Sequence, residues 1–287
     1  MHLAQVQVGA GQVCRRSNLP LRGDCFAWLA MTLVFFIMLA SLPRPAIFAH
    51  RGASAHAPEN TLAAFELALA QSADAIELDV KLSADAQVVV IHDTTIKRTT
   101  TSAGLVKDLS LGQLRSFDAG SFFSEQFRGE KIPTLAEVFE TVGNRTFINV
   151  ELTNYNTPHD QLVEKVCMLV TQFGLQNRVM FSSFFASNLS QARGYLPEVP
   201  RGLLTFSGLL GAWARSFGFA FGKYDALHPH WKDVTSQQVQ RVHRLHRRIH
   251  VWTVNKADDM RRLFHWGVDA IFTDDPQLAV QVRAESK

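Results

Sequence analysis

From residue 45 onwards, short apolar runs alternate with amphipathic stretches along the chain. The apolar runs predict eight strands: 46–50, 75–80, 146–151, 179–183, 201–206, 225–229, 249–254 and 269–273. The amphipathic stretches predict helices at 61–71, 134–142, 160–173, 187–194, 235–247 and 257–266. Strands separated by helical crossovers predict a parallel sheet, and eight of them favour closure into a (β/α)8 barrel spanning residues 45–282.

One segment breaks this alternation. "AIELDVKLSADAQVVVIHD" (75–93) contains two strand patterns joined by "SADA", with no room for a helix, so a hairpin is expected. A two-residue turn at Asp85-Ala86 would place His92 opposite Asp79, whereas a four-residue loop would place it opposite Glu77. Residues 94–133 then form a small insertion of loops and short helices before the next crossover.

The N-terminus has a different composition. Residues 1–24 are polar and basic, and "CFAWLAMTLVFFIMLASL" (25–42) carries no charge for 18 residues. That run predicts a transmembrane anchor, with the basic residues in the cytoplasm and the barrel outside it. A cleaved signal peptide, which would give a secreted protein, is the close alternative. A start at Met31 and a buried core helix are two further interpretations.

Composition excludes several classes of function. The net charge is only +3, and the one basic run, 241–250, is best explained as the solvated face of a helix, so no nucleic-acid partner is expected. Of the three cysteines only Cys167 lies in the barrel region, which excludes a disulfide framework there. The cysteine and histidine spacing does not match a zinc site.

Ionisable residues gather at the predicted carboxyl ends of the strands, the face on which barrels of this kind carry their active sites. Reading the ends in order gives His50, Arg51, Glu77, Asp79, His92, Glu151, Ser182, Ser183, His228, Trp252, Asn255, Asp274 and Asp275. Glu77 and Asp79 are two apart in a strand and therefore share one face. Together with Glu151 they would place three mutually repelling carboxylates in one mouth, and a hard divalent cation, Mg²⁺ or Ca²⁺, would relieve that repulsion.

Two histidines and an arginine complete the expected site. His50 and His92 can serve as a base and an acid in one reaction, because the imidazole pKa lies near neutral pH. Arg51 offers a bidentate grip on an oxyanion and so indicates a phosphate group. Gly52 permits a sharp turn, and Asn60 or Thr61 is expected to cap the next helix.

These residues occur in a familiar order. "AHRGASAHAPENT", "AIELDVKLSADAQVVVIHD", "RTT", "IPTLAEVF", "INVEL", "VWTVN" and "GVDAIFTDDP" resemble the linked motifs of the glycerophosphodiester phosphodiesterase family over residues 46 to 280. The resemblance implies a (β/α)8 barrel, a divalent cation, and hydrolysis of a glycerophosphodiester to glycerol 3-phosphate and an alcohol. By position, it implies that His50 and His92 are the acid/base pair, that Arg51 and Trp252 bind substrate, and that Glu77, Asp79 and Glu151 hold the metal.

One position departs from the family pattern. The resemblance implies a lysine two residues after the third metal ligand, and Thr153 stands there instead. Two alternative functions are another phosphodiesterase on the same kind of barrel and a non-catalytic barrel that only binds phosphodiesters. The intact set of catalytic positions favours an enzyme.

The segment "GLLTFSGLLGAWARSFGFAFGKY" (202–224) is too apolar for an ordinary loop on the catalytic face. One interpretation is a helix packed on the barrel, supported by the helical spacing of Leu209, Trp213 and Phe217. The other is an interfacial segment that admits lipid-borne phosphodiesters, which predicts lysophospholipase D-type activity.

Overall fold

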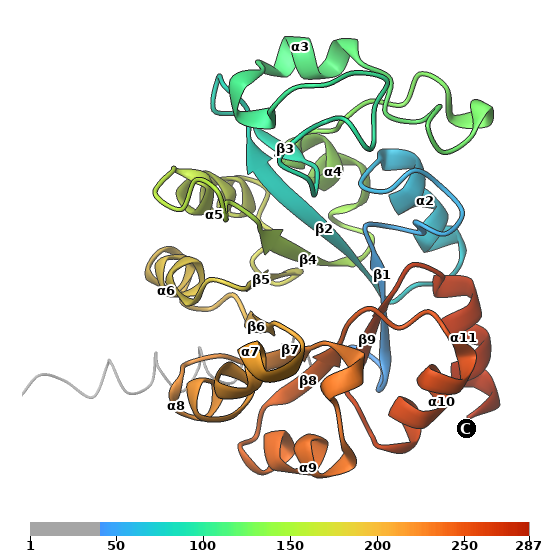
Figure 1. Ribbon diagram of the computed structural model, residues 1–287, viewed down its shortest axis with the longest axis vertical. Coiled ribbons are helices and arrows are strands. Elements are labelled where there is room, and N and C mark those ends of the chain that lie inside the picture. The colour runs from blue at the N-terminus through green and yellow to red at the C-terminus, as the bar shows by residue number, and fades with distance from the viewer. Residues whose placement is uncertain (1–40, 287) are drawn as a thin grey trace, which may run out of the picture.

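The computed structural model describes residues 41–286. The strands are β1 (Ala46–His50), β2 (Ala75–Leu82), β3 (Val88–Val90), β4 (Phe147–Leu152), β5 (Val179–Ser183), β6 (Arg201–Thr205), β7 (Ala226–Pro229), β8 (Arg248–Val251) and β9 (Ala270–Thr273). They form one sheet that closes on itself, because β1 pairs in parallel with both β9 and β2. Only β3 is antiparallel, on β2 outside the closed ring. The predicted (β/α)8 barrel is therefore confirmed (Figure 1).

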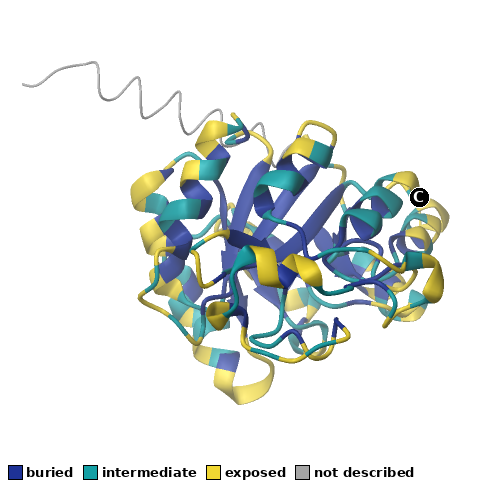
Figure 2. Ribbon diagram, turned by 90° about the horizontal axis from the view of Figure 1, so that it is seen from above, coloured by how far each residue is buried: buried dark blue, intermediate teal, exposed yellow. Residues whose placement is uncertain are grey.

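Helices cover the outside of the barrel, so that the strands are buried and the outer helical faces are exposed (Figure 2). The crossover helices are α2 (Leu62–Ala70), α4 (Leu135–Val142), α5 (Leu162–Gln172), α6 (Ala186–Tyr195), α9 (Ser236–Arg244) and α10 (Ala257–His265), and α11 (Pro276–Glu285) follows the last strand. The segment between β6 and β7 forms α7 (Gly208–Trp213), the π-helical turn η3 (Ala214–Gly218) and α8 (Phe219–Phe221). Thr61 caps α2 as expected, since its hydroxyl accepts from the Ala64 amide.

Strand alternation decides which side chains enter the barrel. Ile47 and Ala49 of β1 belong to the core between sheet and helices, whereas Phe48 belongs to the core inside the barrel. His50 is the next residue on the Phe48 side, and it therefore points into the barrel at its carboxyl end. The same alternation on β4 stacks Asn149 and Glu151 above the interior residue Phe147.

The hairpin exists, but both registers expected from the sequence are wrong. Val80 pairs with Val90 and Leu82 with Val88, one position away from either expected alignment. The cause is a three-residue loop closed between Ser83 and Gln87, in which Ala86 adopts a left-handed conformation with φ of 55°. β3 ends at Val90, so strand pairing does not fix the position of His92.

Beyond β3 the chain forms a small satellite next to the barrel. It contains the 3-10 turns η1 (Val106–Asp108) and η2 (Glu125–Phe127) and the helix α3 (Leu111–Ser116), seen at one end of the molecule in Figure 1. A separate apolar cluster, which includes Ile96 and Leu114, holds this satellite against β3.

Within residues 41–286 no helix is long and apolar enough to cross a membrane. Residues 25–40 of the predicted anchor lie outside the described residues, so the anchor stays a prediction.

Two histidines are buried in the barrel interior. His228 and His250 lie with ring centroids 5.0 Å apart, among the rings of Phe48 and Phe272. Neither ring nitrogen of His228 has a hydrogen-bond partner among the described residues. Burial lowers the pKa of His228 to about 3 and the pKa of His250 well below its ordinary value. Both imidazoles are therefore neutral in the folded protein at neutral pH.

These histidines predict loss of stability in acid. The unfolded chain takes up protons near the ordinary pKa of 6.5, whereas folded His228 does so only near pH 3, so the free energy of unfolding falls as pH drops between those values. The loss is about 1.4 kcal/mol per pH unit for each histidine. In urea unfolding at about pH 7.5 and about pH 5, His228→Leu should lose about 2 kcal/mol less than the wild type. Exposed His265→Gln serves as the control; equal losses in the wild type and His228→Leu would contradict the assignment.

Candidate active site

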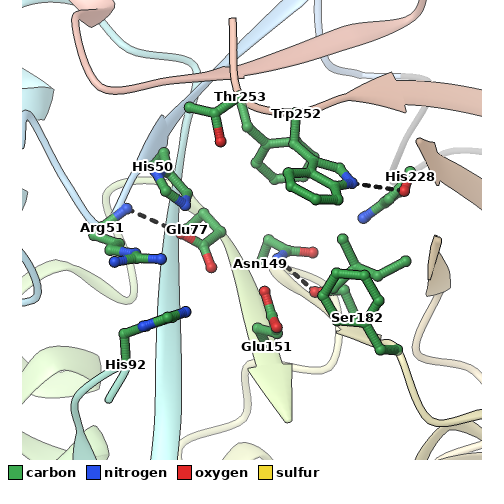
Figure 3. Close-up of a pocket in the computed structure, with 13 residues that line it drawn as sticks. His50, Arg51, Glu77, His92, Asn149, Glu151, Ser182, His228, Trp252 and Thr253 are labelled. Carbon is green, nitrogen blue, oxygen red and sulfur yellow. Dashed lines mark hydrogen bonds between the residues drawn. The ribbon is translucent and has the colours of Figure 1, made fainter. Parts of the chain in front are cut away.

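A cavity of about 120 Å³ opens at the carboxyl ends of the barrel strands. Its lining residues are His50, Arg51, Glu77, His92, Asn149, Glu151, Ser182, Phe184, Leu204, His228, Trp252, Thr253 and Phe272. Figure 3 shows His50, Arg51 and His92 on one side of the cavity, and Trp252 and His228 across from them. The family resemblance assigns seven residues to the site, namely the acid/base pair, two substrate-binding residues and three metal ligands, and six of these line the cavity. The seventh, Asp79, is buried and 1% exposed, beside the Arg51 guanidinium.

The three predicted metal-binding carboxylates lie together. Glu77, Asp79 and Glu151 each offer one oxygen, and these oxygens lie within 4.8 Å of one another. Strand pairing explains the arrangement, because Asp79 of β2 is in register with Glu151 of β4 and their side chains share the interior face. Glu77 Oε1 and Asp79 Oδ1 are buried without a hydrogen-bond partner among the described residues. A divalent cation with oxygen ligands fits such a cluster.

Burial and mutual repulsion shift the titration of these groups. Burial, then the charges of Asp79 and Glu151, raise the pKa of Glu77 well above its ordinary value. Burial and Asp79 raise the pKa of Glu151 to about 8. Burial also acts to raise the pKa of Asp79, but Arg51, His92 and the Asn60 amide outweigh it and lower that pKa. One carboxylate thus stays charged beside the guanidinium, while the other two favour a proton or a cation.

The backbone holds Arg51 in an unusual conformation. Its φ is 58°, in the left-handed region, and its amide donates to Glu77 Oε2 at 2.9 Å. Gly52 follows with φ of 83°, and a Cβ there would lie 2.6 Å from the Ala64 carbonyl carbon. Only glycine therefore fits at position 52. The turn directs the Arg51 guanidinium between Asp79, 3.2 Å from its Nε, and Glu59, which accepts from Nη1 at 2.9 Å.

Each candidate catalytic histidine is held by a carboxylate. His50 Nδ1 lies 2.6 Å from Asp274 Oδ1, and His92 Nδ1 lies 2.7 Å from Asp93 Oδ1. An ionised carboxylate only accepts, so Nδ1 donates in both pairs, which leaves Nε2 available for proton exchange. Asp274 is itself fixed by Ser54 and Asn255.

A chain of charged groups connects Arg51 with His92. Arg98 donates to Glu59 at 2.6 and 2.8 Å and to Asp93 at 2.8 and 3.0 Å. Glu59 also binds Arg51, and Asp93 binds His92, so Arg98 joins the two halves of the site. The position of Arg98 in the "RTT" motif does not predict this role, whereas the "HD" pair at 92–93 places Asp93 next to His92.

Trp252 forms one wall of the cavity. Its indole Nε1 donates to the His228 carbonyl at 2.8 Å, and its ring meets Phe184 edge-on with centroids 5.7 Å apart. The indole is thereby fixed in the wall of the cavity, where it can contact a bound molecule.

Thr153, where the resemblance implies a lysine, contacts a lysine of the neighbouring strand. Lys81 extends from β2, and its Nζ donates to the carbonyl and hydroxyl oxygens of Thr153 at 2.7 and 3.0 Å. Burial lowers the pKa of Lys81, and the charges of Asp79 and Glu151 oppose that shift. Thr153 thus accepts two hydrogen bonds from a buried ammonium group, whose side chain does not line the active-site cavity.

Comparisons with known proteins agree with this geometry. The sequence model of the glycerophosphoryl diester phosphodiesterase family matches residues 50–278. A glycerophosphodiester phosphodiesterase of Caldanaerobacter subterraneus subsp. tengcongensis is 38% identical over 237 residues, which cover 82% of this chain and 96% of the relative. One of Bacillus altitudinis is 38% identical over 245 residues, covering 84% of this chain and 99% of the relative.

Solved structures show the same fold. A phosphodiesterase of Oleispira antarctica, in complex with the product sn-glycerol-3-phosphate, superposes with a TM-score of 0.77 at 32% identity, covering 84% of this chain and 97% of that one. A glycerophosphodiester phosphodiesterase of Agrobacterium tumefaciens superposes with a TM-score of 0.72 at 30% identity, covering 82% and 99%. Fold, site and sequence thus agree, and the chain belongs to the glycerophosphoryl diester phosphodiesterase family of phosphoric diester hydrolases.

Proposed function

We propose that this enzyme hydrolyses glycerophosphodiesters to glycerol 3-phosphate and an alcohol by two-histidine acid/base catalysis that depends on a divalent cation. The observation that carries the proposal is the pair of imidazoles, each with Nδ1 bound to a carboxylate, facing one cavity with the carboxylate cluster. The glycerol 3-phosphate held by the Oleispira antarctica relative supports this substrate class.

Glu77, Asp79 and Glu151 would hold the cation, Mg²⁺ or Ca²⁺, because hard cations prefer carboxylate oxygens. When bound, the cation would neutralise charge on the phosphate oxygens. Arg51 lines the cavity beside the cluster and would bind a non-bridging phosphate oxygen. Its contacts with Glu59 and Asp79 orient the guanidinium before substrate arrives.

The two histidines would move protons in opposite directions. One Nε2 takes the proton of the nucleophile, water or a glycerol hydroxyl, as the new P–O bond forms. The other Nε2 gives its proton to the leaving alcohol as the old P–O bond breaks. Asp274 and Asp93 hold the donor tautomer at Nδ1 throughout. Trp252 would pack against the substrate on the opposite wall.

For the N-terminus, we propose that residues 25–42 anchor the enzyme in a membrane with its barrel outside the cytoplasm, or direct its secretion if they are cleaved. The uncharged run and the basic residues that precede it support this placement.

Substitution of either histidine tests the catalytic pair. His50→Ala and His92→Ala should each lower kcat on glycerophosphocholine by at least about a hundredfold, the usual scale of general acid/base catalysis. Added imidazole should restore part of the activity, whereas exposed His265→Ala should behave as the wild type. Near wild-type turnover of either variant at saturating metal would remove that residue from the mechanism.

Metal binding can be tested without turnover. A ligand that binds only the folded state raises the melting temperature, so Mg²⁺ or Ca²⁺ should stabilise the chelator-treated wild type. Glu77→Gln and Asp79→Asn should abolish most of that rise, because each removes a charged ligand from a buried cluster. Exposed Glu125→Gln is the matched control. An unchanged metal-dependent rise in the first two variants would refute the ligand assignment.

Arg98 should act as a positioning residue. Arg98 holds the pKa of Asp93 well below its usual range, so Arg98→Gln should move the acidic limb of the pH–rate profile to higher pH as Asp93 protonates more easily. It should also lower kcat by about tenfold, more than it changes KM, because His92 loses its fixed orientation. Arg128→Gln, which breaks the exposed Arg128–Glu125 pair, is the control. Equal pH profiles for both variants would mean that Arg98 has no part in positioning.

A further inference from the structure

The segment between β6 and β7 presents apolar side chains to solvent on the catalytic face of the barrel. Its exposed fractions are 94% for Leu209, 88% for Leu210, 70% for Trp213, 64% for Phe217 and 85% for Phe221. We call these five residues the apolar ridge. The interpretation of this segment as a helix simply packed on the barrel is wrong for all five. An exposed apolar patch of this kind marks a surface that meets an apolar partner.

Contacts of Phe219 and Arg215 hold the segment that carries the apolar ridge against the barrel. Phe219 is buried, with the Arg247 guanidinium carbon 4.9 Å from its ring centroid. Arg215 turns inward, donates to the carbonyls of Phe206 and Gly208 at 2.5 and 2.7 Å, and lies 3.3 Å from Asp233. The polar contacts are thus made beneath the segment, and the apolar side chains face outward. An amphipathic helix on the surface of a soluble protein has the opposite arrangement.

The π-helical turn η3 keeps the ridge on one side of the segment. Leu209, Trp213, Phe217 and Phe221 recur every four residues through α7, η3 and α8. The rings of Phe217 and Phe221 lie nearly parallel, with centroids 6.5 Å apart. Four large apolar groups therefore form one stripe that can enter a single apolar layer.

An aromatic wall connects the ridge with the active-site cavity. Phe206, at the end of β6, stacks on Phe184 with ring centroids 4.5 Å apart. Phe184 lines the cavity and meets Trp252, which lines it too. A molecule with its phosphodiester in the cavity could therefore keep an attached apolar chain against aromatic surface up to the base of the ridge.

We propose that the apolar ridge docks the barrel on a lipid surface and delivers lysophospholipids to the active site. This inference rests on the proposed function, since the same hydrolysis would act on a glycerophosphodiester that carries one acyl chain. Water would form the new P–O bond, the P–O bond to the headgroup alcohol would break, and lysophosphatidic acid would remain. The uncharged run 25–42 of the same chain, whose composition suits a membrane, supports a lipid rather than a protein occupant.

Kinetics with two substrates that share a headgroup test the proposal. In the full chain, the double variant Trp213→Ala/Phe217→Ala should lose about tenfold or more in kcat/KM on micellar lysophosphatidylcholine, because each removes an apolar group from the contact. Its kcat/KM on soluble glycerophosphocholine should stay within about twofold of wild type, since neither residue lines the cavity. The matched control is Met168→Ala/Tyr195→Ala, which truncates two exposed apolar residues of α5 and α6 and should leave both substrates unaffected.

A direct contact measurement separates the possible occupants. An environment-sensitive fluorophore at Leu210→Cys, with Cys14 and Cys25 replaced by serine, should report a polar environment in detergent-free buffer and shift to the blue with phosphatidylcholine vesicles. The same label at Met168→Cys should shift less. Sedimentation of wild type and double variant should give equal masses.

Several results would overturn the inference. These are equal losses on both substrates, no loss on lysophosphatidylcholine, or a label at position 210 that is already in an apolar environment without lipid, as the chain's own N-terminal run would produce. A wild-type dimer that the double variant dissociates would make the ridge a subunit interface instead. A wild type inactive on glycerophosphocholine would refute the proposed function itself, whereas activity there with none on lysophosphatidylcholine refutes only this inference.

Discussion

The arrangement of the active site depends on the mutual repulsion of three carboxylates, of which Glu77 and Asp79 are buried and Glu151 is partly exposed. Their ligand oxygens lie within 4.8 Å of one another at the mouth of a barrel whose lower interior is aromatic and apolar. Such a cluster is stable only with compensating positive charge or bound protons. Arg51 supplies part of that charge, and it reaches Asp79 because its backbone adopts a left-handed conformation next to Gly52. Backbone strain and carboxylate repulsion are thus two parts of one arrangement, which the closed sheet holds in place.

The parts of the fold that follow from local pattern could be predicted. The apolar runs gave β1 and β5 with their observed bounds, and strand alternation correctly placed Glu77 and Asp79 on one face. The hairpin register could not be predicted, because it depends on the left-handed conformation of Ala86. Nothing in the sequence of this turn favours that conformation over a two-residue or a four-residue loop. Helix α11 was also missed, although Asp275 caps it and Pro276 begins it.

The hydrogen bonds that hold the active-site residues could not be predicted for a different reason. Arg98 meets Glu59 across 39 positions of sequence, and His50 meets Asp274 across 224. A local pattern has no information on such distances, so it indicates which residues have useful chemistry but not which of them contact each other. The exposure of the apolar ridge could not be predicted either, because apolar residues spaced at i and i+4 give the same sequence pattern whether they face the core or the solvent.

The hydrogen bonds between Lys81 and Thr153 have a consequence for how these two positions are compared with relatives. Lys81 of β2 donates to both oxygens of Thr153, just past the end of β4, and its side chain does not line the active-site cavity. The Thr153 hydroxyl in turn donates to the Val80 carbonyl of β2. These bonds join the carboxyl ends of the two strands that carry Asp79 and Glu151. A relative without a hydroxyl at position 153 would leave a lysine at position 81 with one acceptor fewer, so the two positions are best compared together as a hydrogen-bonded pair.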